Sequence, residues 1–317
     1  MDTQKACDDI ISTLATENRW LSNDNYPLYF YQGFWFPCAF IRGTIAAQAV
    51  SFDLSPSDII LACNPKSGTT WLKALAFAIT TRSRFSQSDP NHPLHLKNSH
   101  DLIPRLEAED FIRSDLNLIS THLPYTGLPP SVAVNGCKIV YIWRDPKDAF
   151  VSLWHMNQKM RPNKEETEPI PLQDAFDLFC NGVSAFGPYW DHVLGYWKAL
   201  LERPESILFL KYEDMMNNTE VHVKKLAEFM GCPFSAEEDE EGVVANIVEM
   251  CSFQRLSNLE VNKVQKIPQK GAPDVSKNIL FRKAKVGDWA NYLTQEMAAK
   301  IDQVTMDKFG SHSGLIN

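Results

Sequence analysis

Four short stretches of the chain are largely apolar. Near-continuous runs of this kind are typical of strands that are buried on both faces of a parallel sheet. They predict strands at residues 58–63, 117–122, 138–144 and 207–215.

Between these strands the apolar residues recur at helical spacing. The pattern predicts helices at residues 69–82, 145–160, 171–203 and 219–231. The third is broken near Gly187 and Pro188, and Asp145 and Pro146 are the residue types that begin a helix. Alternating strands and helices predict βαβ units with right-handed crossovers. We therefore expect an α/β fold, with a mostly parallel central sheet flanked by helices, in a single domain over residues 1–317.

Three segments show neither pattern and are expected to be irregular. They are residues 83–100, 161–171 and 262–288. Long loops in a compact domain are usually lids or binding loops, so we expect lids at 83–100 and 262–280. Residues 1–25 are expected to form an N-terminal helix or tail.

The composition narrows the classes of function. Of the 317 residues, 44% are hydrophobic and 22% are charged, as in ordinary soluble proteins. The net charge of −8 argues against a broad basic surface for nucleic acid. No apolar run is long enough to cross a bilayer and the N-terminus lacks a signal pattern, so we expect a cytoplasmic protein without a membrane partner. Seven scattered cysteines without zinc-binding spacing indicate reduced thiols.

The first predicted strand runs into NPKSGTTW at residues 64–71, which then opens a helix. The free N–H groups and dipole at such a helix start attract an anion. Gly68 lets the backbone approach the ligand closely, and Lys66 adds a positive charge. Further hydroxyl donors are Ser67, Thr69 and Thr70. The alternative is a plain turn with a helix cap, but the position after a buried strand favours an anion site.

This loop differs from the P-loop of nucleotide kinases. There the lysine follows the glycine and the next hydroxyl residue binds magnesium, whereas here Lys66 precedes Gly68. In addition, the strand at 138–144 ends in arginine rather than in a magnesium-binding aspartate. These features disfavour a magnesium-dependent phosphotransferase and favour a site in which side-chain cations replace a metal.

A second anion contact is predicted at the end of the strand at 138–144. Arg144 lies at the sheet edge where open α/β sheets bind ligands. Ser152 follows eight residues later, about two helical turns along. The alternative role of Arg144 is a salt bridge to Asp145 or Asp148.

A third group of cations lies near the C-terminus, in LFRKAKVGDW at residues 280–289. Arg282 and Lys283 are adjacent there, and Phe281 and Trp289 are expected to anchor the segment. Such clusters of charge are often only part of a solvated surface, but the flanking aromatic residues favour a loop with a function.

His122 is the best candidate for a general base. It closes the predicted strand at 117–122, at the same sheet edge as Arg144. Neutral imidazole is available near its ordinary pKa of ~6.5. His155, one helical turn from Ser152, is the second candidate.

Together these motifs resemble the cytosolic sulfotransferase family, and within it the plant-type members. The motifs PKSGTTW, RDPKDAFVS and FRKxxxGDW occur in the family's order, and the resemblance covers nearly the whole chain. It implies transfer of a sulfuryl group from 3′-phosphoadenosine 5′-phosphosulfate to a hydroxyl or amine of a small molecule.

The resemblance also implies which residues meet the donor. The 5′-phosphosulfate is implied to contact Lys66, Ser67, Gly68, Thr69 and Thr70. The 3′-phosphate is implied to contact Arg144, Ser152, Arg282 and Lys283, with Ala284 beside them. The adenosine is implied to lie among Trp71, Tyr212, Cys251, Ser252, Phe253 and Leu256.

The resemblance assigns three catalytic roles. His122 matches the family's base, which takes the acceptor proton as attack begins. Lys66 neutralises the bridging oxygen of the leaving phosphate, and Ser152 holds Lys66 away until the acceptor arrives. Positioning and electrostatics dominate such a transfer, as in phosphoryl transfer.

The chain departs from the family pattern at three places. Ala284 replaces a glycine, which puts the affinity for the donor in question if the backbone there needs a positive φ. Ser120 stands where many animal members have a lysine. The animal dimer motif KxxxTVxxxE is missing from 287–300, which favours a monomer or a weak or different homodimer.

The acceptor site is expected to be apolar and to take a phenol, flavonoid, steroid or hormone-like alcohol. Its predicted residues are Trp35, Tyr125 and Met156. Phe36, Phe150 and Trp154 are further candidates, with ordinary core packing as the alternative. Two other functions stay open: a nucleotide-dependent phosphotransferase and a non-catalytic binder of small ligands.

Overall fold

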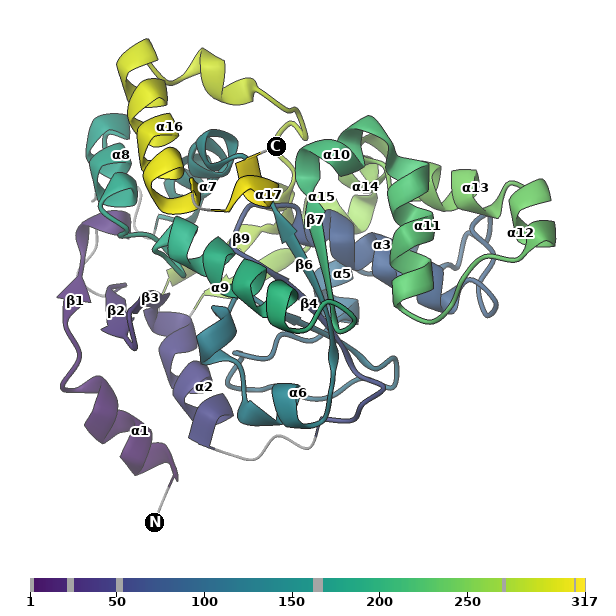
Figure 1. The fold of residues 1–317 in the computed structure, drawn as a ribbon, viewed down its shortest axis with the longest axis horizontal. Coiled ribbons are helices and arrows are strands. Elements are labelled where there is room, and N and C mark those ends of the chain that lie inside the picture. Colours follow the sequence, from purple (N-terminus) through teal and green to yellow (C-terminus); the bar gives the residue numbers. More distant parts are fainter. Residues whose placement is uncertain are drawn as a thin grey trace.

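A four-stranded parallel sheet forms the centre of the protein (Figure 1). The structure is a computed structural model that describes residues 3–21, 26–49, 54–161, 168–269, 272–310 and 312–316. The strands are β4 (Ile59–Cys63), β5 (Leu118–Thr121), β6 (Lys138–Trp143) and β7 (Ile207–Lys211), in the order β5-β4-β6-β7. The predicted α/β fold with a parallel sheet is confirmed.

Alternate residues of these strands point into two separate cores. Ile60 and Tyr141 belong to one apolar cluster, and Leu61 and Val140 belong to the other. This follows from the two-residue period of a strand, and it explains why the strand sequences are apolar throughout.

Helices cover both faces of the sheet (Figure 1). The core around Leu61 includes side chains of α3 (Thr69–Thr81), α11 (Thr219–Phe229) and α13 (Val243–Met250). The core around Ile60 includes side chains of α7 (Pro146–Met160), α8 (Leu172–Cys180), α9 (Tyr189–Glu202) and α16 (Gln295–Phe309). Asp145 caps α7 as predicted, because its side chain accepts the N–H of Lys147 at 2.8 Å.

The remaining elements surround this α/β core. In the N-terminal part, α1 (Thr3–Ile11) and α2 (Cys38–Ala49) flank a small antiparallel sheet of β1 (Thr16–Glu17), β2 (Leu28–Tyr31) and β3 (Phe34–Pro37). Shorter helices are α6 (Pro130–Val134), α12 (Ala236–Glu240), α14 (Phe253–Asn258), α15 (Glu260–Val264) and α17 (Ser313–Ile316).

Three predictions for the elements need correction. The fourth strand ends at Lys211, and Tyr212 begins α10 (Tyr212–Asn217), whose first turn carries acidic residues that suit a helix N-terminus. The segment 83–100 includes α4 (Pro93–Leu96) and the start of α5 (Ser99–Leu102), which the side chains of His92 and Asn98 cap. The segment 262–288 contains β8 (Lys266–Gln269) and β9 (Ala272–Ser276). Part of the irregular segment 161–171 lies outside the described residues.

The order of the strands indicates where a ligand would bind. From β4 the chain moves to β5 on one side and then crosses to β6 on the other. Ligands of open α/β sheets bind at such a reversal, beyond the carboxyl ends of the strands. The loop 64–68, His122 and Arg144 directly follow β4, β5 and β6.

Candidate active site

The loop between β4 and α3 has the backbone of a close-fitting anion site. Lys66 and Gly68 both have positive φ, of 67° and 114°. A side chain at Gly68 would place its Cβ 2.9 Å from the ring of Tyr212 and 3.0 Å from Ile142. Only glycine therefore fits at residue 68, while the strained lysine is of the kind found at functional sites.

Lys66 contributes the positive charge of this loop. Within the described ranges no carboxylate lies within ion-pair distance of its ammonium group. Burial and the charges of Arg144 and Arg282 together lower the pKa of Lys66 to about 8. These positive charges repel one another, and an anionic ligand bound beside them would stabilise their charged forms.

Arg144 is almost buried at the end of β6. It donates to the carbonyl of Lys285 at 2.8 Å, lies 3.3 Å from a carboxylate oxygen of Asp148 and stacks 4.5 Å from the ring of Tyr212. Its Nε is buried and has no partner among the residues that the structure describes. The salt bridge to Asp148 is confirmed, but it leaves a donor of Arg144 for a ligand.

Asp148 joins Arg144 to the C-terminal segment. Its two carboxylate oxygens accept the N–H groups of Gly287 at 2.8 Å and Trp289 at 3.0 Å. The side chain is fully buried and lies one helical turn before Ser152, which is also buried. The sequence predicts Asp148 only as a possible salt-bridge partner of Arg144, because its bonds to Gly287 and Trp289 join segments far apart in the chain.

Arg282 and Lys283 are held together by Asp288. Arg282 bonds to one oxygen of that carboxylate, and the ammonium of Lys283 lies 3.0 Å from the other. Burial would raise the pKa of Asp288, but the hydrogen bonds from Lys283 and Arg282 lower it to about 2. Phe281 and Trp289 anchor the segment, as predicted, in the two opposite cores of the sheet.

Ala284 has a φ of 48°, so the glycine of the family pattern is replaced at a left-handed position. We expect Ala284→Gly to raise the free energy of unfolding by about 0.5–1 kcal/mol, because it removes strain of ~1–2 kcal/mol and adds some chain entropy to the unfolded state. Chemical denaturation measures this change. Ala290→Gly, at an exposed position without a positive φ, should be destabilising; an equal loss in both variants would contradict the prediction.

His122 follows β5, and its environment selects one tautomer. Its Nδ1 lies 2.9 Å from the carbonyl oxygen of Cys63, so Nδ1 must carry the proton. Nε2 then has a free lone pair. Burial, together with the charge of Arg105, holds the pKa of His122 well below its ordinary value. The side chain is 8% exposed, and it is bonded to the last residue before the anion loop.

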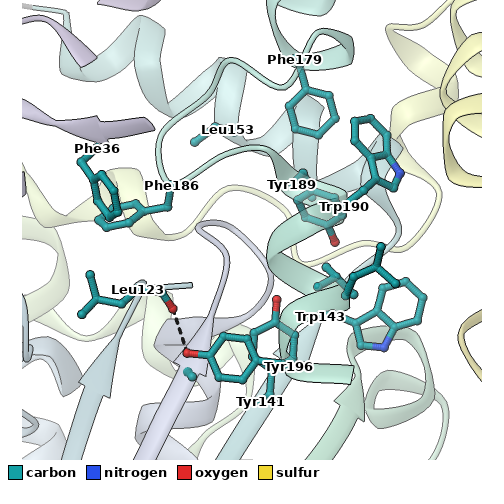
Figure 2. Packing of buried hydrophobic residues seen from close by; sticks show 14 of the residues in the cluster. Phe36, Leu123, Tyr141, Trp143, Leu153, Phe179, Phe186, Tyr189, Trp190 and Tyr196 are labelled. Carbon is teal, nitrogen blue, oxygen red and sulfur yellow. Dashed lines mark hydrogen bonds between the residues drawn. The ribbon is translucent and has the colours of Figure 1, made fainter. Parts of the chain in front are cut away.

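Buried polar groups fix the backbone around His122. Glu107 is fully buried and accepts from the N–H of His122 at 2.9 Å and the hydroxyl of Thr121 at 2.8 Å. On the other side, Nε2 of His192 lies 2.9 Å from the carbonyl of His122. Tyr196 donates to the carbonyl of Leu123 at 2.8 Å, the dashed line in Figure 2. No motif in the sequence indicated Glu107.

Aromatic side chains pack beside His122. The ring centroid of Phe186 lies 5.4 Å from that of the imidazole and 5.8 Å from that of Phe36, and Figure 2 shows the two phenylalanine rings in contact. Phe186 has a positive φ of 58°, which is unusual for an aromatic residue, and Asn64 of the anion loop donates to its carbonyl at 3.1 Å. No sequence motif indicates Phe186, since only its backbone conformation distinguishes it.

The residues predicted for the acceptor come from three elements. Trp35 lies in β3 and is bonded through its backbone to Phe186. Tyr125 begins the 3₁₀ turn after His122, and its ring lies 5.6 Å from that of Tyr196. Met156 is half-buried in α7. Their contact with an acceptor stays a prediction. A groove of about 530 Å³ beside β7, lined by Trp143, Trp197 and Phe209, contains none of the predicted site residues.

Two of the residues predicted for the adenosine lie together. The rings of Trp71 and Tyr212 are 5.7 Å apart, next to Gly68 and Arg144. Phe253 is 6.3 Å from Phe281. The others are less suited to direct contact through their side chains: Cys251 and Leu256 are buried in a core, and Ser252 caps α14. Their role at the nucleotide stays a prediction.

The matches to known proteins define the class of this chain. The family model described as a sulfotransferase domain matches residues 56–312. The chain belongs to the sulfotransferase family, and it is an enzyme of that class.

Its relatives include named plant enzymes. It is 46% identical over 314 residues to cytosolic sulfotransferase 17 of Arabidopsis thaliana, covering 96% of this chain and 89% of the relative. It is 45% identical to flavonol 3-sulfotransferase of Flaveria bidentis, covering 98% and 99% of the two chains.

Solved structures agree with this class. The crystal structure of an Arabidopsis thaliana sulphotransferase matches with a TM-score of 0.72 and 37% identity, over 95% of this chain and 92% of the other. A mouse sulfotransferase complexed with PAP matches with a TM-score of 0.65 and 27% identity, over 89% and 95%.

The described residues lack two further features. They contain no group of three or more His, Cys, Asp or Glu placed to hold a metal ion. No helix among them has the length and apolar character needed to cross a membrane.

Proposed function

We propose that this sulfotransferase moves a sulfuryl group from 3′-phosphoadenosine 5′-phosphosulfate to a hydroxyl of a small aromatic or alicyclic molecule. One observation carries the proposal: the proton-accepting Nε2 of His122 lies on an imidazole bonded to the residue that precedes the loop 64–68. The base and the anion loop are thereby built from the ends of two adjacent strands.

The donor suits the distribution of charge. It carries an anionic group at each end, and the described residues supply cations in two places. Lys66 and the N–H groups at the start of α3 would hold the phosphosulfate. Arg144, Arg282 and Lys283 would hold the 3′-phosphate, with Ser152 as a hydroxyl donor. The mouse sulfotransferase on the same fold was solved in complex with PAP, which supports the assignment of a nucleotide site here.

The chemical step follows from these positions. The acceptor oxygen attacks sulfur, and a new S–O bond forms as the S–O bond to the phosphate breaks. The acceptor proton goes to Nε2 of His122, and the leaving phosphate keeps the electron pair. Lys66 neutralises the charge that grows on the phosphate oxygen. We also propose that Ser152 binds Lys66 and holds it away from the phosphate oxygen until the acceptor arrives.

The acceptor is proposed to be a flat phenolic compound, with flavonols tested first. Tyr125 is a partly buried aromatic residue three positions after His122, and it suits contact with a planar ring; Phe186 and Phe36 are buried and would support such a site from within the core. Relatives named flavonol 3- and 4′-sulfotransferases support this choice. A cytosolic location agrees with the names of the relatives, and we propose a monomer or weak homodimer.

Ligand binding and turnover test the proposed function together. A thermal shift with 3′-phosphoadenosine 5′-phosphate, and none with ATP and magnesium, is the expected result. Labelled donor should then transfer sulfate to members of a phenol and flavonol panel, and EDTA should leave the rate unchanged. Binding without product on any acceptor would favour the non-catalytic binder, and a response to ATP and magnesium would favour a phosphotransferase.

A further inference from the structure

A lysine is buried in the helix that follows the anion loop. Lys73 in α3 is 1% exposed, which is rare for this residue type. Its ammonium group donates to the carbonyl of Ile103 at 3.2 Å and lies 3.4 Å from Nδ1 of His100. No carboxylate of the described residues is within ion-pair distance of it, so its partners are neutral.

His100 connects this lysine to the anion loop. Its Nε2 lies 2.9 Å from the hydroxyl oxygen of Thr70, one helical turn before Lys73. The surrounding segment is docked firmly, because Ser99 donates to the carbonyl of Thr70 at 3.1 Å and Asn98 caps the short helix α5. The chain Lys73–His100–Thr70 thus ends at a hydroxyl in the first turn of α3.

The chemistry of the donors gives this chain a direction. An ammonium group has no lone pair, so Lys73 must donate to Nδ1 of His100. A neutral imidazole then carries its proton on Nε2 and donates to Thr70. The hydroxyl oxygen is occupied as an acceptor, and its own proton is free for another group.

The electrostatics agree with a neutral His100. Burial and the charge of Lys73 hold the pKa of His100 well below its ordinary value. Burial and Arg105 lower the pKa of Lys73 itself to about 7. An anion bound beside Thr70 would raise the pKa of Lys73 again, so ligand binding favours the charged form that sets the direction.

We propose that Lys73 and His100 are positioning residues that turn the hydroxyl proton of Thr70 toward the 5′-phosphate end of the donor. This inference rests on the proposed function, because it requires that the loop 64–70 binds that end. It explains why a lysine is buried one turn after the loop without a carboxylate partner among the residues that the structure describes.

A double-mutant cycle tests the proposal through the affinity for 3′-phosphoadenosine 5′-phosphate, measured by calorimetry. Thr70→Val removes the hydroxyl and should weaken binding about 10-fold or more, as expected for a hydrogen bond to a charged group. His100→Ala should weaken it several-fold. The double variant should bind within about twofold of Thr70→Val, because His100 acts only through that hydroxyl.

Controls separate positioning from structural damage. His100→Gln retains an amide donor near the position of Nε2 and should restore most of the affinity. Adenosine 3′-phosphate lacks the 5′-phosphate, so its affinity should be equal in all variants. Where His100→Ala does not fold, Lys73→Met takes its place in the cycle, with the same expected result.

The outcomes distinguish this inference from the proposed function. If the unmodified protein fails to bind 3′-phosphoadenosine 5′-phosphate, the proposed function is wrong. If it binds but the losses from Thr70→Val and His100→Ala multiply in the double variant, or adenosine 3′-phosphate is affected equally, the positioning role is wrong. An unchanged affinity in both His100→Ala and Lys73→Met would also overturn it.

Discussion

Replacing His122 with alanine should lower kcat by about 10²- to 10⁴-fold, the usual contribution of a general base. The affinity for the donor should change little, because the bond from His122 to the protein goes to the carbonyl of Cys63 and not to a cation of the site. Steady-state turnover with labelled donor, and calorimetry with 3′-phosphoadenosine 5′-phosphate, measure the two quantities separately.

The second candidate base supplies the matched control. The ring of His155 lies 4.7 Å from that of Tyr292 in the C-terminal part, and His155→Ala should keep kcat within a few-fold. The pH profile adds a check. Since the pKa of His122 is well below 6.5, the base stays unprotonated and kcat should not fall between about pH 7.5 and 6.5. If His155→Ala lost most of its kcat while His122→Ala kept normal turnover, His155 and not His122 would be the general base.

Lys66→Ala should harm both turnover and donor binding. Loss of a charge placed against the leaving oxygen lowers kcat by about 10²- to 10³-fold. Loss of a hydrogen bond to a charged group weakens donor binding by about 10-fold or more. Lys159→Ala removes an exposed charge that also acts on Lys66, and it should change each quantity less than about threefold.

The pH dependence of binding gives Lys66 a signature of its own. In the free protein its pKa is about 8, and a bound anion favours the protonated form. Donor affinity should therefore be full below pH 8 and should fall as the pH rises above it. In Lys66→Ala the decrease of donor affinity that is due to deprotonation of Lys66 should be absent. A variant that keeps both the pH dependence and the wild-type turnover would exclude Lys66 from the site.

The parts of the site that were predictable are those with local signals. Strands buried on both faces are apolar throughout, so β4, β5 and β6 could be found without the structure. Residues at their carboxyl ends meet at one edge, which brought Lys66, His122 and Arg144 into one hypothesis. Glycine in a family pattern often marks a backbone with a positive φ, and Ala284, which stands in place of such a glycine, has a φ of 48°.

The missed residues depend on contacts between distant segments. Glu107 and His100 lie in a stretch that lacks a clear pattern, and their partners come from distant segments. Glu107 is bonded to Thr121 and His122, whereas His100 reaches Thr70 because α5 packs on α3. Lys73 lies among apolar residues of α3, and the sequence gives no sign that this lysine is buried with them. The apolar residues 207–210 predict a strand that continues through Tyr212, whereas the chain turns into a helix after Lys211.

The link from Asp148 to Gly287 and Trp289 has a consequence for synthesis on the ribosome. The sheet and the base are encoded in the first two thirds of the chain, but Arg282 and Lys283 emerge much later. A nascent protein can therefore form the strands of the sheet before it can bind a nucleotide, while the core around Ile60 is completed only by α16. A product that stops before residue 281 should fold in part around the sheet, yet ignore a nucleotide affinity resin.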